Sequence, residues 1–322
     1  METIRINNYS FEKPLTSDNS GFSKWGIGTR GGQKYFVKEF LSPVYPTEDA
    51  PFTQKKREER IRLCQTFVEG KSKLYSAIRD ASDGHVIAIE QFFRVGSKFY
   101  ISTKAITDPV MSISAIAKCS FLNRIRLCCS IAHAMAEIHK KKIVHADIKP
   151  DNIMVVCKGG LCPNIIDFDC SFFESESPKL GEELNGDLVY LSPEAYLHIA
   201  EIESNLSCKM DVFALGVLFH QYFTGKLPNF DHQSFCYPGE AVANGAPLTL
   251  AKGLPRALAE LLESMLAPNP QDRPAAAEVF EALYMGPDGP GRFIGSGEAA
   301  KAYSGASSAT AGGRRWSQAG DL

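Results

Sequence analysis

One stretch near the middle of the chain limits what the rest can be. Residues 145–152 read His-Ala-Asp-Ile-Lys-Pro-Asp-Asn, and an Asp-Phe-Asp sequence begins fifteen residues after Asn152, at Asp167. The first stretch offers a carboxylate at Asp147, an ammonium at Lys149 and an amide at Asn152. Phosphoryl transfer needs a group that accepts the nucleophile's proton, a cation that neutralises the moving phosphoryl group, and oxygen ligands for Mg²⁺. The spacing therefore favours a phosphotransferase site.

The composition is compatible with a folded protein and excludes several other classes. The chain has 322 residues, 44% of them hydrophobic, which is enough for one large or two medium domains. A net charge of −2 gives no argument for nucleic acid or a membrane surface as a partner. No run reaches the roughly 18 apolar residues of a membrane span, and the N-terminus lacks an apolar signal region. The nine cysteines contain no C-x-x-C pair, so we expect reduced thiols in a cytoplasmic protein of unknown oligomeric state.

The N-terminal part is predicted to be rich in β-strands. Residues 23–29 and 35–40 are rich in β-formers, and the Arg-Gly-Gly-Gln sequence between them is typical of a hairpin turn. With a strand-like stretch at 5–12, they would form a three-stranded antiparallel meander. Two further strands are predicted at 86–89 and 99–102.

Two long helices are predicted, at 54–80 and 112–139. The first opens with a mixed run of basic and acidic residues, which indicates a solvated face. The second carries apolar residues at helical spacing, which predicts a buried stripe. The residues of this stripe are Ile125, Leu127, Ile131, Met135 and Ile138.

The H-x-D-x-K-P-x-N pattern from His145, with the Asp-Phe pair after it, resembles the catalytic loop and metal-binding segment of protein kinases. The lysine two positions after Asp147 is similar to that of serine/threonine kinases rather than tyrosine kinases. The resemblance covers Tyr9 to Leu283 and implies an α+β, bilobal protein-kinase fold with a small β-rich N-lobe and a larger, mainly helical C-lobe. The implied parts are an N-lobe (1–103), a hinge (104–111), a C-lobe (112–285) and a disordered Gly/Ala/Ser-rich tail (286–322).

The resemblance and the residue chemistry together assign roles to the central stretch. Asp147 is the candidate catalytic base, and Lys149 would neutralise the γ-phosphate of ATP. Asn152 would supply an amide oxygen to Mg²⁺. A predicted hairpin around the Lys-Gly-Gly turn at 158–160 would return Asp167 to Asn152, where its carboxylate would bridge metal and phosphates.

Nucleotide-binding residues are expected in the N-terminal part. Lys38 resembles the kinase lysine that grips the α and β phosphates, and we expect Glu69 to pair with it from the helix at 54–80. One departure is that the family places an apolar residue four positions after this glutamate, where this chain has Lys73.

A literal G-x-G-x-x-G runs from Gly26 to Gly31. No helix follows it, and Gly31 lies only seven positions before Lys38, so we reject it as the phosphate loop. We expect the preceding polar loop to take that role, although with one glycine its backbone approaches phosphates less freely. The residues expected to contact the phosphates are Ser20, Gly21, Phe22 and Ser23.

Three residues depart from the family pattern in the central region. Ala146 replaces the arginine that normally pairs with a phosphorylated activation loop, so activity is not expected to need that phosphorylation. Asp169 replaces the glycine after Asp-Phe and could add a ligand or change the mobility of the segment. Asp187 stands where serine/threonine kinases usually carry a threonine, which leaves the substrate class open.

Later motifs extend the resemblance. Ser-Pro-Glu at 192–194 is similar to the end of a kinase activation segment, and its acidic character favours basic peptide substrates. Asp211 opens a strongly apolar helix, where a buried charge needs partners, and the resemblance implies that it holds the backbone of the catalytic loop. Arg273 would form a buried bidentate bridge to Glu194. Small-molecule kinases of the same fold lack these three features.

Three functions remain open from the sequence. The favoured one is an ATP- and Mg²⁺-dependent serine/threonine protein kinase that acts on protein hydroxyl groups, its own included. The second is a pseudokinase scaffold that binds nucleotide or a partner without efficient transfer, as the departures at Ala146, Asp169 and Asp187 suggest. The third is a small-molecule phosphotransferase.

Overall fold

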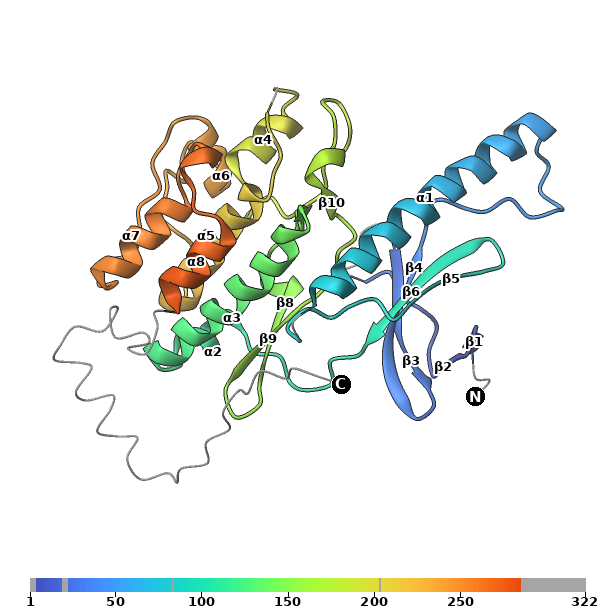
Figure 1. The fold of residues 1–322 in the computed structure, drawn as a ribbon, viewed down its shortest axis with the longest axis horizontal. Coiled ribbons are helices and arrows are strands. Elements are labelled where there is room, and N and C mark those ends of the chain that lie inside the picture. The colour runs from blue at the N-terminus through green and yellow to red at the C-terminus, as the bar shows by residue number, and fades with distance from the viewer. Residues whose placement is uncertain (1–3, 19–22, 83, 203, 285–322) are drawn as a thin grey trace, which may run out of the picture.

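The computed structural model describes residues 4–18, 23–82, 84–202 and 204–284, and Figure 1 shows a β-rich part beside a helical part. The predicted phosphate-loop residues Ser20, Gly21 and Phe22 lie outside the described residues, as does the predicted tail at 286–322. The predicted fold class, a small β-rich lobe and a larger helical lobe, is confirmed.

A six-stranded antiparallel sheet forms the β-rich part, in the order β1-β2-β3-β4-β6-β5. The predicted hairpin is confirmed, since β3 and β4 pair from Arg30↔Gln33 onward and both turn glycines have positive φ. The strands are β1 (Ile4–Ile6), β2 (Tyr9–Phe11), β3 (Ser23–Arg30), β4 (Gln33–Phe40), β5 (Gln91–Val95) and β6 (Lys98–Lys104).

The prediction of a strand at 86–89 is wrong, because the strand in this region is β5 and begins only at Gln91. Val86 and Ile89 are buried and belong to the main hydrophobic core. Residues 86–89 are hydrogen-bonded to the end of β9 instead of to the six-stranded sheet, since the Ile87 amide donates to the Ile165 carbonyl at 2.9 Å. Apolar residues that bury outside a sheet ladder cannot be distinguished from a strand by their pattern alone.

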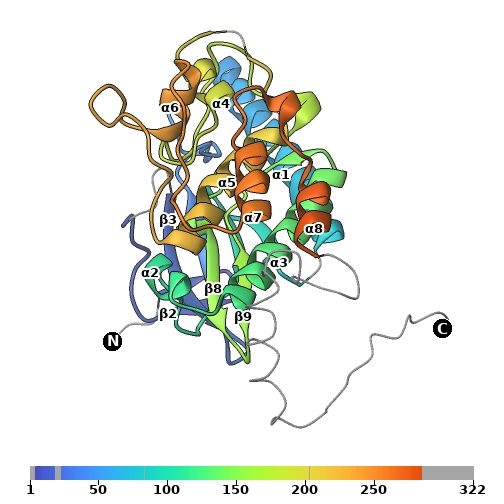
Figure 2. The same ribbon diagram turned by 90° about the vertical axis from the view of Figure 1, so that its left-hand side faces the viewer.

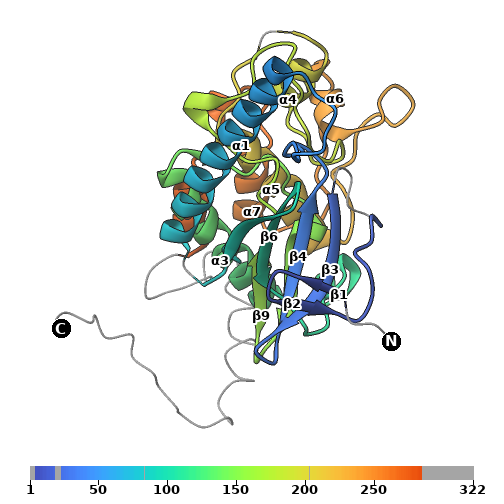
Figure 3. The ribbon, with the colours of Figure 1, turned by 90° about the vertical axis from the view of Figure 1, so that its right-hand side faces the viewer.

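The long helix α1 (Gln54–Ala81) lies between the sheet and the helical part (Figures 1 and 3). Thr53 caps it by accepting a hydrogen bond from the Lys56 amide. Phe67 packs on the sheet, with its ring 5.2 Å from that of Phe40 and 5.5 Å from that of Phe99. The C-terminal half of α1 buries Leu74, Tyr75, Ile78 and Ala81.

The helical part is built around α5 (Lys209–Thr224), which contacts α2, α3 and α7 (Figure 2). The helix predicted at 112–139 is two helices. The first ends at Ala117 with Lys118 as its C-cap, and Ser120 caps the second by accepting a hydrogen bond from the Asn123 amide. The other helices are α2 (Ile113–Ala117), α3 (Phe121–Lys140), α4 (Pro193–Ile199), α6 (Pro238–Ala243), α7 (Arg256–Met265) and α8 (Ala276–Leu283).

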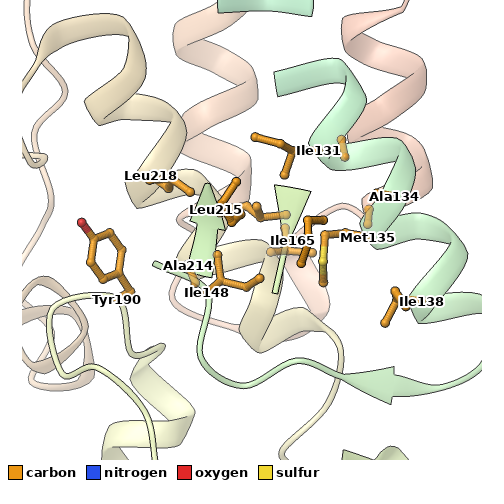
Figure 4. Packing of buried hydrophobic residues seen from close by; sticks show 14 of the residues in the cluster. Ile131, Ala134, Met135, Ile138, Ile148, Ile165, Tyr190, Ala214, Leu215 and Leu218 are labelled. Carbon is orange, nitrogen blue, oxygen red and sulfur yellow. The ribbon is translucent and has the colours of Figure 1, made fainter. Parts of the chain in front are cut away.

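The predicted apolar stripe of α3 is confirmed as core. Figure 4 shows Ile131 and Met135 of α3 near Leu215 of α5 and Ile165, and all four are fully buried. This core supports two short antiparallel sheets of two strands each, and the polar residues of the central stretch lie in the loops that connect the two sheets. The sheets are β7 (Ile143–Val144) with β10 (Phe172–Phe173), and β8 (Ile153–Cys157) with β9 (Leu161–Ile165).

Candidate active site

The backbone of the central loop is held by Asp211, near the start of α5. Its carboxylate accepts hydrogen bonds from the amides of His145 (2.8 Å) and Ala146 (2.9 Å), and His139 Nε2 lies 2.9 Å away. Asp211 is 1% exposed, and these partners compensate the burial of its charge. Ala146 has a φ of +66°, a strained conformation that this clamp helps to maintain.

His145 joins the loop to the Asp-Phe-Asp segment. Its ring lies 4.7 Å from that of Phe168, and its Nε2 lies 3.1 Å from the Ile166 carbonyl oxygen. The hydroxyl of Ser171 donates to the His145 carbonyl at 3.0 Å. The side chain is fully buried, so its contacts are those of a structural residue.

Asp147 is surrounded by donors. Lys149 Nζ lies 2.9 Å from one carboxylate oxygen, and Asn152 Nδ2 donates to the same oxygen at 2.7 Å. The Asp187 amide donates to the other oxygen at 3.1 Å. The carboxylate is thereby fixed in orientation while remaining within reach of the surface, as a general base requires. Asp187 acts here through its backbone, which explains how an aspartate can occupy this position.

Asp167 lies beside this group. The β8–β9 hairpin brings it there, since the Ile166 amide donates to the Asn152 carbonyl at 2.9 Å. Lys38 of β4 contacts both Asp167 oxygens, at 3.1 and 3.0 Å. Burial raises the pKa of Asp167, but the Lys38 ammonium outweighs it and holds that pKa below its ordinary value.

Lys38 also contacts Asp169, whose Oδ2 lies 2.7 Å from its Nζ. The lysine is 7% exposed. Burial lowers its pKa, but the Asp169 and Asp167 carboxylates outweigh this and raise the pKa above the ordinary lysine value. The lysine is therefore a permanent cation inside the site.

The predicted pairing of Lys38 with Glu69 is wrong. Glu69 is exposed on α1, and both ion-pair partners of Lys38 within the described residues come from the Asp-Phe-Asp segment. Two positions along a helix correspond to a rotation of about 200°, so Lys71 rather than Glu69 faces the site. Lys71 Nζ donates to the Asp169 carbonyl at 2.8 Å, and burial lowers its pKa.

The rejected G-x-G-x-x-G has a packing explanation. Gly26 and Gly28 lie within β3, where a Cβ would come within 2.7 Å of Leu15 and 2.9 Å of Phe11, respectively. These glycines make room for apolar side chains of the sheet. Ser23, the one residue of the predicted phosphate loop that the structure describes, is the buried first residue of β3.

A buried ion pair links two distant helical segments of the large part. Arg273 donates two hydrogen bonds to Glu194, at 2.7 and 2.8 Å, and its side chain is fully buried. The two residues meet as the sequence predicts. Glu194 lies at the end of the segment that begins at Cys170 and contacts Asp147 through the Asp187 amide. The bridge fixes this end of the segment, so its role is structural.

Comparison with known proteins agrees with this geometry. Residues 72–285 match the model of the protein kinase domain, and the chain belongs to the protein kinase family. A probable serine/threonine-protein kinase of Clostridium acetobutylicum is 25% identical over 275 residues, which are 80% of this chain and 40% of that protein.

Two further relatives differ in what their names state. Mitogen-activated protein kinase kinase kinase 8 of Rattus norvegicus is 30% identical over 47% of this chain and 32% of its own length. Inactive tyrosine-protein kinase 7 of Mus musculus is 28% identical over 50% of this chain and 15% of its own length. The chain thus spans less than half the length of these three relatives.

The described residues contain neither a membrane-spanning helix nor a cluster of metal-binding side chains. No helix among them has the length and apolar character needed to cross a bilayer. Nor do three or more His, Cys, Asp or Glu side chains gather there in an arrangement that could hold a metal ion by themselves.

Proposed function

We propose that this chain is an active ATP-dependent serine/threonine protein kinase. One observation carries the proposal: Asp147, Asn152, Asp167 and Lys38 come from three separate segments and converge on one hydrogen-bonded site. Asp147 orients the attacking hydroxyl and accepts its proton, and Lys149 places a cation beside that base. Lys38 binds the nucleotide phosphates.

The residues present fit Mg²⁺. Asp167 offers a carboxylate and Asn152 an amide oxygen, and Mg²⁺ is commonly held by one or two such protein ligands together with substrate phosphates. The amide nitrogen of Asn152 is committed to Asp147, which leaves its oxygen as the atom for a cation. When bound, the ion neutralises charge on the phosphate oxygens.

The preference for serine and threonine hydroxyls rests on Lys149 and on the names of distant relatives. The proposed lobes are 1–103 and 112–285, joined by a hinge at 104–111. A cytoplasmic location is part of the proposal and is supported by the nine cysteines, all of them free. Ala146 places the chain among kinases without an arginine before the catalytic aspartate.

The test is transfer of radiolabelled phosphate from ATP to the chain itself or to a basic protein, followed by phosphoamino-acid analysis. Wild type should yield phosphoserine or phosphothreonine, and Asp147→Ala and Asp167→Ala should not. Equal signal from all three proteins would refute the proposal.

A pseudokinase is the second candidate function, and the occupied Lys38 favours it. Both acidic partners of this lysine belong to the chain, so ATP would have to compete for it. Nucleotide-induced thermal stabilisation of the wild type with no turnover is the result that would support this function.

A further inference from the structure

We propose that Asp169 is the positioning residue for Lys38, in the place of a helix glutamate, and that Lys71 of α1 fixes Asp169. The inference deepens the proposed function, on which it rests for the role of Lys38 in nucleotide binding. The glycine position of the Asp-Phe-Gly pattern thereby gains a defined task in this chain.

The contact distances rank the partners of Lys38. Its Nζ lies 2.7 Å from Asp169 Oδ2, compared with 3.0 and 3.1 Å to the oxygens of Asp167. The Asp169 side chain is 22% exposed and the Lys38 side chain 9%, so solvent screens this pair less than a surface pair. If Asp167 binds Mg²⁺, the contact with Asp169 still holds the lysine.

Residues on the face of α1 that meets the site contact Asp169. Lys71 Nζ donates to the Asp169 carbonyl at 2.8 Å, which fixes the backbone of the residue that carries the carboxylate. One turn later, Tyr75 is 2% exposed. Burial, and after it the nearby Asp169 carboxylate, raises the pKa of Tyr75, so α1 places a second polar group beside Asp169.

The charges of Lys38, Lys71 and Asp169 balance one another. Lys71 brings a second ammonium toward Lys38, and two neighbouring cations repel each other unless an anion lies between them. Asp169 is that anion, because its carboxylate contacts Lys38 and its charge opposes the lowering of the Lys71 pKa by burial. A glycine at 169 would leave both lysines without it.

A double-mutant cycle tests the contact without reference to activity. Urea unfolding is measured for wild type, Lys38→Met, Asp169→Asn and the double variant. We expect the two positions to be coupled by on the order of tenfold in the unfolding equilibrium constant. The matched cycle of Lys38→Met with Glu69→Gln should show no coupling, because Glu69 is exposed and does not contact Lys38. Absent coupling at 169, or equal coupling at 69, overturns the inference.

Moving the carboxylate from residue 169 to residue 71 tests whether Asp169 positions Lys38 for nucleotide binding. Asp169→Asn should raise the Kd of a fluorescent ATP analogue, measured in EDTA so that metal binding does not contribute, by roughly tenfold. Adding Lys71→Glu to Asp169→Asn should restore most of that affinity, because it places a carboxylate on the face of α1 that meets the site.

The alternative is that Asp169 is a metal ligand. In that case, Asp169→Asn would leave the Kd in EDTA unchanged and would raise the Mg²⁺ concentration needed for tight binding, which overturns the inference. An affinity in Lys71→Glu/Asp169→Asn no better than in Asp169→Asn also overturns it. Failure of the proposed function is a separate result. If the wild-type protein neither binds nucleotide nor transfers phosphate, the double-mutant cycle still measures the contact between Lys38 and Asp169, because it depends only on stability.

Discussion

Arg273 and Glu194 lie 79 positions apart in the chain and form two parallel hydrogen bonds of 2.7 and 2.8 Å in the interior. Arg273 donates further to the carbonyls of Ala267, Pro268 and Lys209, so its buried guanidinium has several acceptors. The end of the segment after Cys170 is thereby fixed to the core of the large part.

Removing one member of this pair should strongly destabilise the protein. Arg273→Ala leaves the Glu194 carboxylate buried and unpaired, which we expect to cost about 3–5 kcal/mol in the free energy of unfolding. Urea denaturation measures it. Arg256→Ala is the matched control, since its 2.7 Å pair with Glu260 is exposed and should contribute less than about 1 kcal/mol. Equal losses in both variants would contradict the prediction.

Asp211→Asn should lower both stability and transfer activity. An asparagine can present only one oxygen to the amides of His145 and Ala146, and its NH₂ group would oppose the second amide. We expect a loss of about 2–3 kcal/mol in the free energy of unfolding, measured in urea. The exposed Asp80→Asn serves as a control with the same chemical change, and it should leave stability and activity unchanged.

Transfer activity should not depend on phosphorylation of the segment after Cys170. Glu174 already anchors this segment, because its carboxylate accepts from the Cys208 amide at 2.9 Å and lies 3.3 Å from Lys142 Nζ. Burial raises the pKa of Glu174, but the contacts with Cys208 and Lys142 together outweigh it and lower that pKa. Phosphatase-treated and untreated protein should transfer phosphate at equal rates, whereas Glu174→Gln should be slower. A large loss on phosphatase treatment would contradict this.

Stability should fall as the pH drops below 6.5, partly because of His220. Burial lowers the pKa of His220 from the ordinary value of 6.5, and the Ala251 amide donates to its Nε2 at 3.0 Å, which requires a neutral ring. As the pH falls, His220 is protonated in the unfolded chain before it is protonated in the folded one. Its contribution to the free energy of unfolding is therefore constant above pH 6.5 and declines between pH 6.5 and the lower pKa of the folded state. His220→Gln should flatten this decline in urea titrations between pH 7 and 5. The exposed His232→Gln should not, and equal slopes for His220→Gln and wild type would refute the assignment.

Much of the site could be predicted because its residues are close in the sequence or chemically obliged to pair. Asp147, Lys149 and Asn152 lie on one short loop, so their meeting needs only a tight turn. A charged residue that opens a buried helix, such as Asp211, must find donors, and the loop amides provide them. The hairpin that returns Asp167 is likewise a local structure.

The part that could not be predicted depends on the rotation of α1 about its axis. Composition places a helix at 54–80, but the face that meets the site is decided by packing of Leu74, Tyr75 and Ile78 in the core. A signal was present in the sequence: Tyr75, a buried aromatic, lies four positions after Lys71, whereas the polar Lys73 lies four positions after Glu69. The partner of Lys38 came from a segment distant in the chain, which no helical periodicity can reveal.

The measurement that bears most directly on the proposed kinase activity is the rate of phosphate transfer by Asp147→Asn relative to wild type. Asparagine keeps the shape of the side chain and removes its ability to accept a proton, so kcat should fall by roughly 10²–10⁴-fold. The exposed Glu69→Gln makes the same chemical change outside the site and should retain the wild-type rate. A wild type with measurable transfer and an Asp147→Asn variant of equal rate would contradict the assignment of Asp147 as the base.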